Sequence, residues 1–334
     1  MDTAAQMTEQ SPTASALLVD ATAALAAAGV PSARLDAEVL LATASGIDRT
    51  ALYARANLPG TTEAQQMFRG LLTRRLRREP LQYIVGRQEF WSLDLVVTPD
   101  VLIPRPESEL LVELALALTR SRESSDDHIA SPRSRRGEPR VRPVLMASQS
   151  VRGRSQGSPL HTSRDFERRI TLCDLGTGSG CLAVALAREL PHADVWAVDR
   201  SIAALAAARE NARCHDVERI RFVAGDLFAP IGDACFDMIV CNPPYIASNA
   251  LAQLQPELAW EPRGALDGGA DGLDVIRRVV AAAPAHLISG GWLIMEIGAD
   301  QGPAALDLAH AARFAHVSVR DDYAGRPRVL LARR

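Results

Sequence analysis

Four consecutive residues, Asn242-Pro243-Pro244-Tyr245, carry the most specific chemistry in this sequence, directly after an apolar run at 236–241. Two consecutive prolines cannot continue a β-ladder, because neither has a backbone N–H and both have a fixed φ. The chain must therefore leave its strand abruptly and hold the Asn242 carboxamide and the Pro243 carbonyl at the strand's carboxyl end. Two acceptors fixed in this way can bind the hydrogens of a planar NH2 group, and Tyr245 can pack over that group. Taken alone, the same residues could simply end a strand.

A glycine-rich turn lies upstream, between an apolar strand and a helix that begins at 181. The turn reads Asp174-Leu175-Gly176-Thr177-Gly178-Ser179-Gly180. Its glycines permit positive φ and close approach of a ligand, and the following helix offers unpaired N–H groups. Nucleotide, flavin and nicotinamide sites share such turns, so this feature alone is weak evidence.

Two further expected strands, at 195–198 and 220–224, end in Asp199 and in Gly225-Asp226-Leu227. In a parallel sheet the carboxyl ends of neighbouring strands meet at one edge, where ligands bind. These strand ends therefore predict one ligand cleft together with the glycine turn and Asn242.

These motifs resemble those of class I S-adenosylmethionine-dependent methyltransferases. The glycine turn looks like their first motif, and Asn-Pro-Pro-Tyr looks like the fourth motif of the members that methylate amino groups. Within that group the chain is similar to the peptide chain release factor glutamine-N5 methyltransferases, on residues at 80–91, 103–109 and 261–266. The resemblance covers nearly the whole chain except the extreme N-terminus and one central stretch.

The resemblance implies that the cofactor is S-adenosyl-L-methionine. Asp174 is expected near its ammonium group, Asp199 at the ribose hydroxyls, and Asp226 at the adenine amino group with Leu227 beside the ring. The full set of implied cofactor-binding residues is Asp174, Gly176, Thr177, Gly178, Ser179, Gly180, Asp199, Asp226, Leu227 and Asn242. Two alternatives stay open. Asp199 could simply cap a helix without contacting the ribose, since Ser201 follows it, and Asp226 could be an ordinary turn residue.

The implied catalytic residues are Asn242, Pro243, Pro244 and Tyr245. They also form the substrate site, joined by Arg105 and Glu107 from the 103–109 segment. Arg105 and Glu107 could instead form salt bridges to the neighbouring hairpin. Glu261 and Arg263 have no assigned role, and Glu296 could face the cleft or cap the helix that follows.

The resemblance implies methylation of the glutamine N5 atom in the Gly-Gly-Gln loop of class I peptide chain release factors. Enzymes that methylate adenine N6 in DNA or guanine N2 in RNA use similar motifs, so they are the alternative class. A formal charge of −3 and a pI near 6.2 argue against a general nucleic-acid binder. A non-catalytic cofactor-binding module is also conceivable, although it would have no need to keep the acceptors at 242–245.

The five cysteines include no Cys-x-x-Cys pair, which favours reduced thiols in a cytoplasmic protein over disulfides or a metal site. No basic leader precedes an apolar run at the N-terminus, and no apolar run reaches membrane-spanning length. We therefore expect a cytoplasmic enzyme without a metal or a membrane partner.

The chain is expected to belong to the α/β class, with a Rossmann-like methyltransferase domain at 170–334. Strands near 170–175, 194–199, 220–224, 236–241, 291–297, 315–320 and 328–332 would form a mostly parallel seven-stranded sheet. The last strand should be antiparallel, because its short connection leaves no room for a crossover helix. Helices are expected near 181–190, 201–213, 272–284 and 302–313.

The region before the sheet divides into four expected parts. Residues 1–15 should be a disordered N-terminus, and 16–79 a helical bundle in which Ser32 and Thr61 or Thr62 begin helices. The resemblance implies that this bundle is substrate-binding and helps to grip the protein substrate. Residues 80–119 should contain a β-hairpin, with strands at 83–90 and 93–97, and a connecting helix at 108–119. The Arg-, Ser- and Pro-rich stretch at 120–169 is expected to be a disordered insertion, either a tolerated surface loop or a basic arm.

Overall fold

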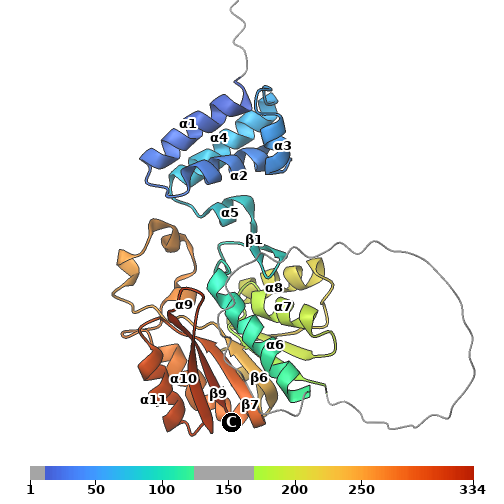
Figure 1. The fold of residues 1–334 in the computed structure, drawn as a ribbon, viewed down its shortest axis with the longest axis vertical. Helices are drawn as coiled ribbons and strands as arrows, with labels where there is room; N and C mark the ends of the chain where they lie inside the picture. Colours follow the sequence, from blue (N-terminus) through green and yellow to red (C-terminus); the bar gives the residue numbers. More distant parts are fainter. Residues whose placement is uncertain (1–11, 124–168) are drawn as a thin grey trace, which may run out of the picture.

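The computed structural model describes residues 12–123 and 169–334. At one end lies a helical bundle of α1 (Ala14–Ala27), α2 (Ala33–Ser45), α3 (Arg49–Ala54) and α4 (Thr62–Leu76), as Figure 1 shows. Its core includes Leu25, Leu40 and Phe68, each almost completely buried. This agrees with the expected bundle, although α3 was not predicted.

The residues at the N-termini of α4 and α2 were both predicted to begin helices, but only one of them caps its helix. Thr61 caps α4 as predicted, since its hydroxyl accepts a hydrogen bond from the Ala64 amide at 3.2 Å. Ser32 does precede α2, but its hydroxyl donates to the Asp36 carboxylate at 2.7 Å and makes no cap hydrogen bond. The first helix begins at Ala14, inside the region expected to be a disordered N-terminus, and residues 1–11 lie outside the described residues.

The linker contains α5 (Leu81–Val85), β1 (Arg87–Phe90) and β2 (Leu93–Val96), followed by η1 (Pro106–Ser108) and α6 (Glu109–Glu123). The hairpin is confirmed by the antiparallel pairing of β1 with β2, but the expected strand at 83–85 is wrong. Those residues form a helical turn that Gly86 ends in the left-handed conformation, while the Tyr83 hydroxyl donates to the Val101 carbonyl. The insertion expected at 120–169 lies mostly outside the described residues, and α6 continues through Glu123.

Residues 170–334 are built on a seven-stranded sheet in the order β5-β4-β3-β6-β7-β9-β8. The strands are β3 (Thr171–Leu175), β4 (Asp194–Asp199), β5 (Arg221–Ala224), β6 (Phe236–Cys241), β7 (Leu287–Glu296), β8 (His316–Asp321) and β9 (Pro327–Arg333). Strands β5, β4, β3, β6 and β7 pair in parallel, and β9 runs antiparallel to both of its neighbours. The predicted mostly parallel sheet with a reversed last strand is therefore confirmed.

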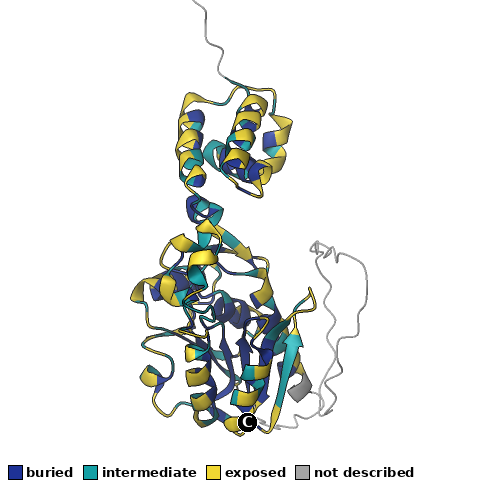
Figure 2. Cartoon of the chain, turned by 90° about the vertical axis from the view of Figure 1, so that its left-hand side faces the viewer, coloured by how far each residue is buried: buried dark blue, intermediate teal, exposed yellow. Residues whose placement is uncertain are grey.

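Helices cover both faces of this sheet. Besides α6, they are α7 (Cys181–Glu189), α8 (Ile202–Cys214), α10 (Asp274–His286) and α11 (Gly302–Ala311). Alternate residues of β3 divide between the two layers: Leu172 packs in the cluster with α6 and α7, and Cys173 in the cluster with α10 and α11. Figure 2 shows that the buried residues concentrate in the strands and on the inner sides of these helices.

The loops at the carboxyl edge of the sheet contain short helices. These are η2 (Ala229–Ile231), η3 (Leu251–Gln253), η4 (Pro256–Trp260) and α9 (Arg263–Leu266). Ion pairs connect η4 to the bundle: Glu257 accepts from Arg78 at 2.7 Å and lies 3.0 Å from Arg75. Among the described residues, no helix combines the length and apolar character that crossing a membrane requires.

Candidate active site

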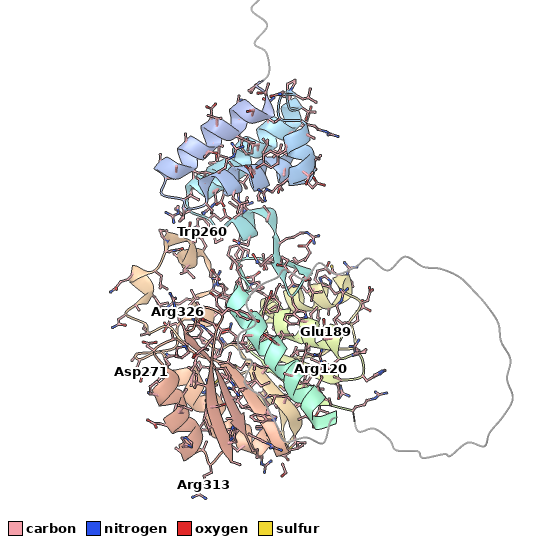
Figure 3. All side chains as sticks on the ribbon, viewed as in Figure 1. Arg120, Glu189, Trp260, Asp271, Arg313 and Arg326 are labelled. Atoms are coloured by element: carbon pink, nitrogen blue, oxygen red, sulfur yellow. The ribbon has the colours of Figure 1, made fainter. Side chains whose placement is uncertain are left out.

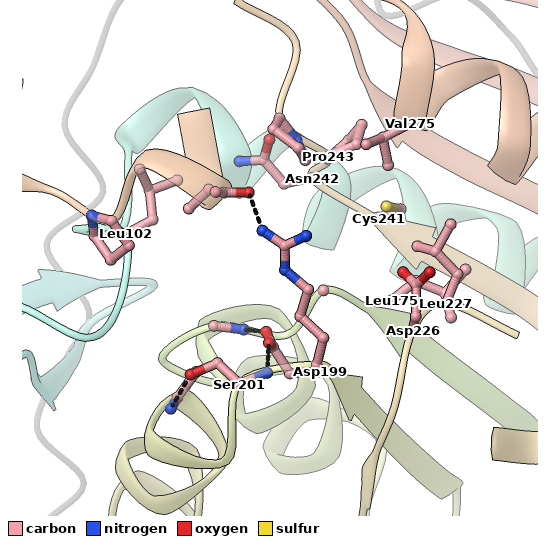
Figure 4. Close-up of a pocket in the computed structure, with 18 of the residues that line it drawn as sticks. Leu102, Leu175, Asp199, Ser201, Asp226, Leu227, Cys241, Asn242, Pro243 and Val275 are labelled. Carbon is pink, nitrogen blue, oxygen red and sulfur yellow. Dashed lines mark hydrogen bonds between the residues drawn. The ribbon is translucent and has the colours of Figure 1, made fainter. Parts of the chain in front are cut away.

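A cavity of about 280 Å³ lies at the carboxyl ends of β3, β4, β5 and β6 (Figure 4). It brings together strand ends that are far apart in the sequence, as the parallel order predicts. The predicted site residues that line it are Gly176, Gly178, Asp199, Asp226, Leu227, Asn242, Pro243 and Pro244.

Four predicted cofactor residues do not line this cavity: Asp174, Thr177, Ser179 and Gly180. Asp174 lies behind the turn, where its Oδ2 accepts from Thr177 Oγ1 at 2.6 Å and from the Ala183 amide at 3.2 Å. Its position near a cofactor ammonium therefore stays a prediction. In the part of the chain that the structure describes, Asp174 Oδ1 is the one buried side-chain polar atom without a hydrogen-bond partner. Complete burial raises the pKa of this carboxyl to about 7.

The glycine turn leaves open space on its cavity side. Gly176 and Gly178 have φ values of 71° and 55°, and a Cβ added at either would meet no atom within 4 Å. Asp199 holds the turn in place, because its Oδ2 accepts from the Gly178 amide at 2.9 Å. Its Oδ1 accepts from the Ser201 amide at 2.8 Å, and Ser201 in turn caps α8. Asp199 thus stabilises the helix start and also lines the cavity.

Two arginines that the sequence reasoning missed border the same cavity. Arg278 pairs with Asp226, and Arg200 donates to the Gly264 carbonyl at 3.4 Å. Arg200 could have been found from its position directly after Asp199, whereas no feature of the sequence indicated Arg278. The lining fits a nucleoside with a cationic amine: carboxylates suit hydroxyls and amino groups, and Leu227 supplies apolar surface. The residues present therefore fit S-adenosylmethionine.

A second cavity of about 260 Å³ adjoins the first. Asn242 and Pro243 line both cavities, so they stand at the boundary between them. The other predicted residues that line the second cavity are Arg105, Glu107 and Tyr245. A group held at this boundary would have access to a ligand in either cavity.

A hydrogen-bond network fixes the Asn242 side chain. Asn242 Nδ2 donates to Ser108 Oγ at 2.8 Å, and Ser108 Oγ donates to Glu296 Oε2 at 2.6 Å. The Tyr245 hydroxyl donates to the other Glu296 oxygen at 3.1 Å. Glu296 also lines the second cavity and so faces the cleft, one of its two predicted positions. Ser108 was not one of the predicted site residues, although it belongs to the 103–109 segment on which the resemblance rests. Burial raises the pKa of both Glu296 and Tyr245.

The oxygen end of the Asn242 amide takes no part in this network. No described residue donates to Asn242 Oδ1, and this oxygen is not one of the buried atoms that lack a partner. It is therefore reachable from the space that Asn242 lines. In the same way, no described residue donates to the Pro243 carbonyl. The two acceptors predicted from the sequence are both available.

Two protein-family models match parts of this chain. Residues 16–86 match the PrmC N-terminal domain, and residues 159–261 match the methyltransferase small domain. A protein of Geobacter sulfurreducens named release factor glutamine methyltransferase is 42% identical over 307 residues, 92% of this chain and 91% of its own length. A protein of the same name from Moorella thermoacetica is 40% identical, over 95% of this chain and 97% of its own. The chain belongs to the release factor glutamine methyltransferase family.

The likeness to one solved structure is more limited. A ribosomal protein L11 methylase from Lactobacillus delbrueckii subsp. bulgaricus is 23% identical, covers 51% of this chain and 73% of its own, and has a TM-score of 0.38. Family membership confirms the predicted class: the chain is an S-adenosylmethionine-dependent methyltransferase, and the nucleic-acid alternative finds no support in these relatives.

In this methyltransferase Arg105 does not bridge to the hairpin. It pairs with Glu261, and the other Glu261 oxygen accepts from the Ile103 amide at 3.1 Å. Glu261 is 6% exposed and so ties the 103–105 segment to the loop that carries α9. Arg263 pairs with Asp267 on the exposed side of that loop. Glu261 therefore has a structural contact that the sequence left unassigned.

Proposed function

We propose that this enzyme transfers a methyl group from S-adenosyl-L-methionine to the glutamine N5 atom in the Gly-Gly-Gln loop of class I peptide chain release factors. The observation that carries the proposal is the position of Asn242, which lines both cavities and whose amide oxygen accepts no hydrogen bond from the described residues. The 42% identical relative bears the name release factor glutamine methyltransferase, which supports the substrate. The first cavity would hold the cofactor and the second the glutamine side chain.

The chemistry required is activation of a poor nucleophile. The lone pair of an amide nitrogen is delocalised into its carbonyl. Asn242 Oδ1 and the Pro243 carbonyl can each accept one N–H of the substrate amide, which fixes the NH2 group at the boundary of the two cavities. Both acceptors also stabilise positive charge as it develops on the nitrogen. Fixing the orientation of the reactants supplies a further part of the acceleration.

When bound, S-adenosylmethionine supplies an electrophilic methyl group on a positively charged sulfur. Transfer of that methyl group would form an N–C bond as the S–C bond breaks, leaving its electron pair on a neutral thioether, and the nitrogen would pass its extra proton to water. Tyr245 provides one wall of the second cavity, and its hydroxyl is anchored on Glu296, which restricts the rotation of its ring.

The bundle at 16–79 would help to grip the protein substrate. An open groove of about 780 Å³ is lined by Leu35 and Arg75 from the bundle and by Leu258 from η4. Arg105 and Leu258 line both this groove and the second cavity, so a peptide in the groove could reach the site. Figure 3 shows Trp260, at the end of η4, between the bundle and the sheet domain.

The test is methylation of a purified class I release factor with S-adenosylmethionine carrying a labelled methyl group. The expected product is one labelled methyl on the glutamine of the Gly-Gly-Gln loop. A release factor with that glutamine replaced should accept none. Methyl transfer to DNA or RNA, with none to the release factor, would overturn the proposal.

A further inference from the structure

We infer that Ser108 and Glu296 are positioning residues that decide which end of the Asn242 carboxamide meets the substrate, an inference that rests on the proposed function. The two residues are each 1% exposed and form a chain from Asn242 Nδ2 through Ser108 Oγ to Glu296. They come from separate parts of the fold: Ser108 from η1 and Glu296 from the end of β7.

The direction of this chain of hydrogen bonds follows from the carboxylate. When its carboxyl is ionised, Glu296 only accepts hydrogen bonds, so both of its oxygens then require donors. Tyr245 supplies one and Ser108 supplies the other. A serine hydroxyl has a single hydrogen, and Ser108 commits it to Glu296. Its lone pairs are then left to accept, and the NH2 end of Asn242 is the donor that reaches them.

Asn242 therefore has its oxygen turned toward the cavities. The two ends of a carboxamide have nearly the same size, so packing alone discriminates poorly between the two orientations. In the flipped orientation, Asn242 would present its own NH2 group to the NH2 group of the substrate. Two donors would then face each other, and the substrate would lose one of its two acceptors.

Because Ser108 and Glu296 are buried, water cannot easily take the place of either hydrogen-bond partner. A buried polar group left without a partner destabilises the folded state, so each member of the network keeps its neighbour in one hydrogen-bonding role. Replacing Glu296 with glutamine removes this constraint, because a glutamine amide can donate to Ser108. Ser108 could then donate to Asn242 Oδ1, which would stabilise the flipped orientation.

The first test observes the amide directly and needs no substrate. The chain contains four asparagines, Asn57, Asn211, Asn242 and Asn249. Selective [15N]asparagine labelling therefore gives four side-chain NH2 signals, and Asn242→Asp assigns one by its loss. Asn57 and Asn249 are exposed, whereas Asn211 is buried and donates to the Val96 and Ser179 carbonyls, so they provide fast- and slow-exchanging references.

We expect the Asn242 NH2 hydrogens to exchange with solvent more slowly than those of Asn249, and Ser108→Ala to remove that protection. Equal exchange rates for Asn242 in the wild type and in Ser108→Ala would overturn the inference. This readout distinguishes the two proposals: an enzyme that methylates no release factor contradicts the proposed function, while a protected Asn242 still supports the positioning network.

The second test is kinetic. Ser108→Ala and Glu296→Gln should each lower kcat by about 10- to 100-fold, by analogy with loss of the hydrogen-bond partners that orient metal-binding side chains. Calorimetry should show unchanged S-adenosylmethionine affinity, and Ser108→Thr, which keeps the hydroxyl, should restore most of the lost activity.

The control is Thr119→Val, which removes another buried hydroxyl, on α6, that bonds to the Ala115 carbonyl of its own helix. This change should alter thermal stability without changing kcat. If Ser108→Ala and Glu296→Gln also keep the wild-type kcat, the two residues are only structural and the inference is wrong.

Discussion

At the residue scale, the site depends on acceptors that are held in one orientation. Asn242 and Pro243 lie where two cavities meet, and their oxygens accept nothing from the described residues. Asp199 and Asp174 both bind the backbone around the glycine turn, but Asp199 also lines the first cavity, whereas Asp174 lies behind the turn. Side chains of one chemical type thus divide between the cavity surface and the support behind it.

Replacing Asn242 with alanine removes one acceptor for the substrate amide. We expect kcat to fall by roughly 10²- to 10³-fold, as for loss of one preorganised hydrogen-bond partner in a transition state. Binding of S-adenosylmethionine, measured by calorimetry, should persist. Asn249→Ala, in the exposed loop that follows, is the matched control and should be fully active. Loss of cofactor binding in Asn242→Ala would mean that Asn242 acts mainly in the first cavity.

The buried Asp174 predicts a pH dependence of stability. Its folded pKa is about 7, above the ordinary value of 3.8, so the folded protein holds a proton that the unfolded chain has released. Between about pH 4 and pH 7 the free energy of unfolding should therefore fall as pH rises, by up to about 1.4 kcal/mol per pH unit. Denaturant unfolding of the cofactor-free protein measures this slope.

Asp174→Asn cannot release that proton, so its unfolding free energy should depend less on pH over the same interval. The stability of the variant relative to the wild type should increase toward pH 7. Parallel pH profiles for the two proteins would contradict a raised pKa at Asp174.

At the element scale, the junction of the glycine turn with α7 and α8 places the cofactor surface. Gly180 occupies the N-cap position of α7 with φ at 80°, and a Cβ there would lie 2.9 Å from Ala208 Cβ and 3.1 Å from Ala208 Cα. The close approach of the two helices and the positive φ both require glycine. Neither helix could keep its place with a larger residue at this point.

Gly180→Ala should lower the free energy of unfolding by about 2–4 kcal/mol, combining left-handed strain with overpacking. It should also weaken S-adenosylmethionine binding, because the turn would move with α7. Gly46→Ala is the control: Gly46 also has a positive φ, of 63°, but its Cβ would meet no atom within 4 Å. That change should cost only about 1–2 kcal/mol. Equal losses in the two variants would show that the contact with Ala208 is unimportant.

At the scale of the whole molecule, a buried charge cluster joins the bundle to the sheet domain. Arg75 contacts Asp36 at 2.7 Å and Glu257 at 3.0 Å, and its side chain is 5% exposed. Arg78 reinforces the contact to Glu257. Through η4 this cluster leads to Glu261, which holds Arg105 at the second cavity. The position of the bundle and the shape of the substrate site are therefore physically connected.

Glu257→Ala should leave Arg75 and Arg78 without their shared partner and lower the free energy of unfolding by roughly 1–3 kcal/mol. If the bundle holds the release factor, KM for that substrate should rise more than kcat falls. Glu210→Ala breaks the exposed Arg213 pair and should change neither quantity measurably. A KM that stays at the wild-type value in Glu257→Ala would show that this cluster does not organise the protein substrate site.

The sequence by itself determined the local features of this protein. Proline chemistry placed Asn242 and Pro243 at a strand end, apolar runs located the strands of the sheet, and a short last connection required the reversed β9. Each of these follows from residues that are close in the chain. The pattern at 83–90 predicted a single strand, but it covers two elements. Residues 83–85 belong to a helical turn that Gly86 ends, and β1 begins only after it.

Only the tertiary structure decided how the site is supported. Ser108 lies 134 positions from Asn242 and 188 positions from Glu296, and Arg105 lies 156 positions from Glu261. No local pattern encodes such contacts, because serine and glutamate are also common on exposed surfaces. They became partners when the sheet brought the ends of β6 and β7 together beside η1. The orientation of the Asn242 amide is consequently a property of the fold, although the choice of asparagine at that place is visible in the sequence.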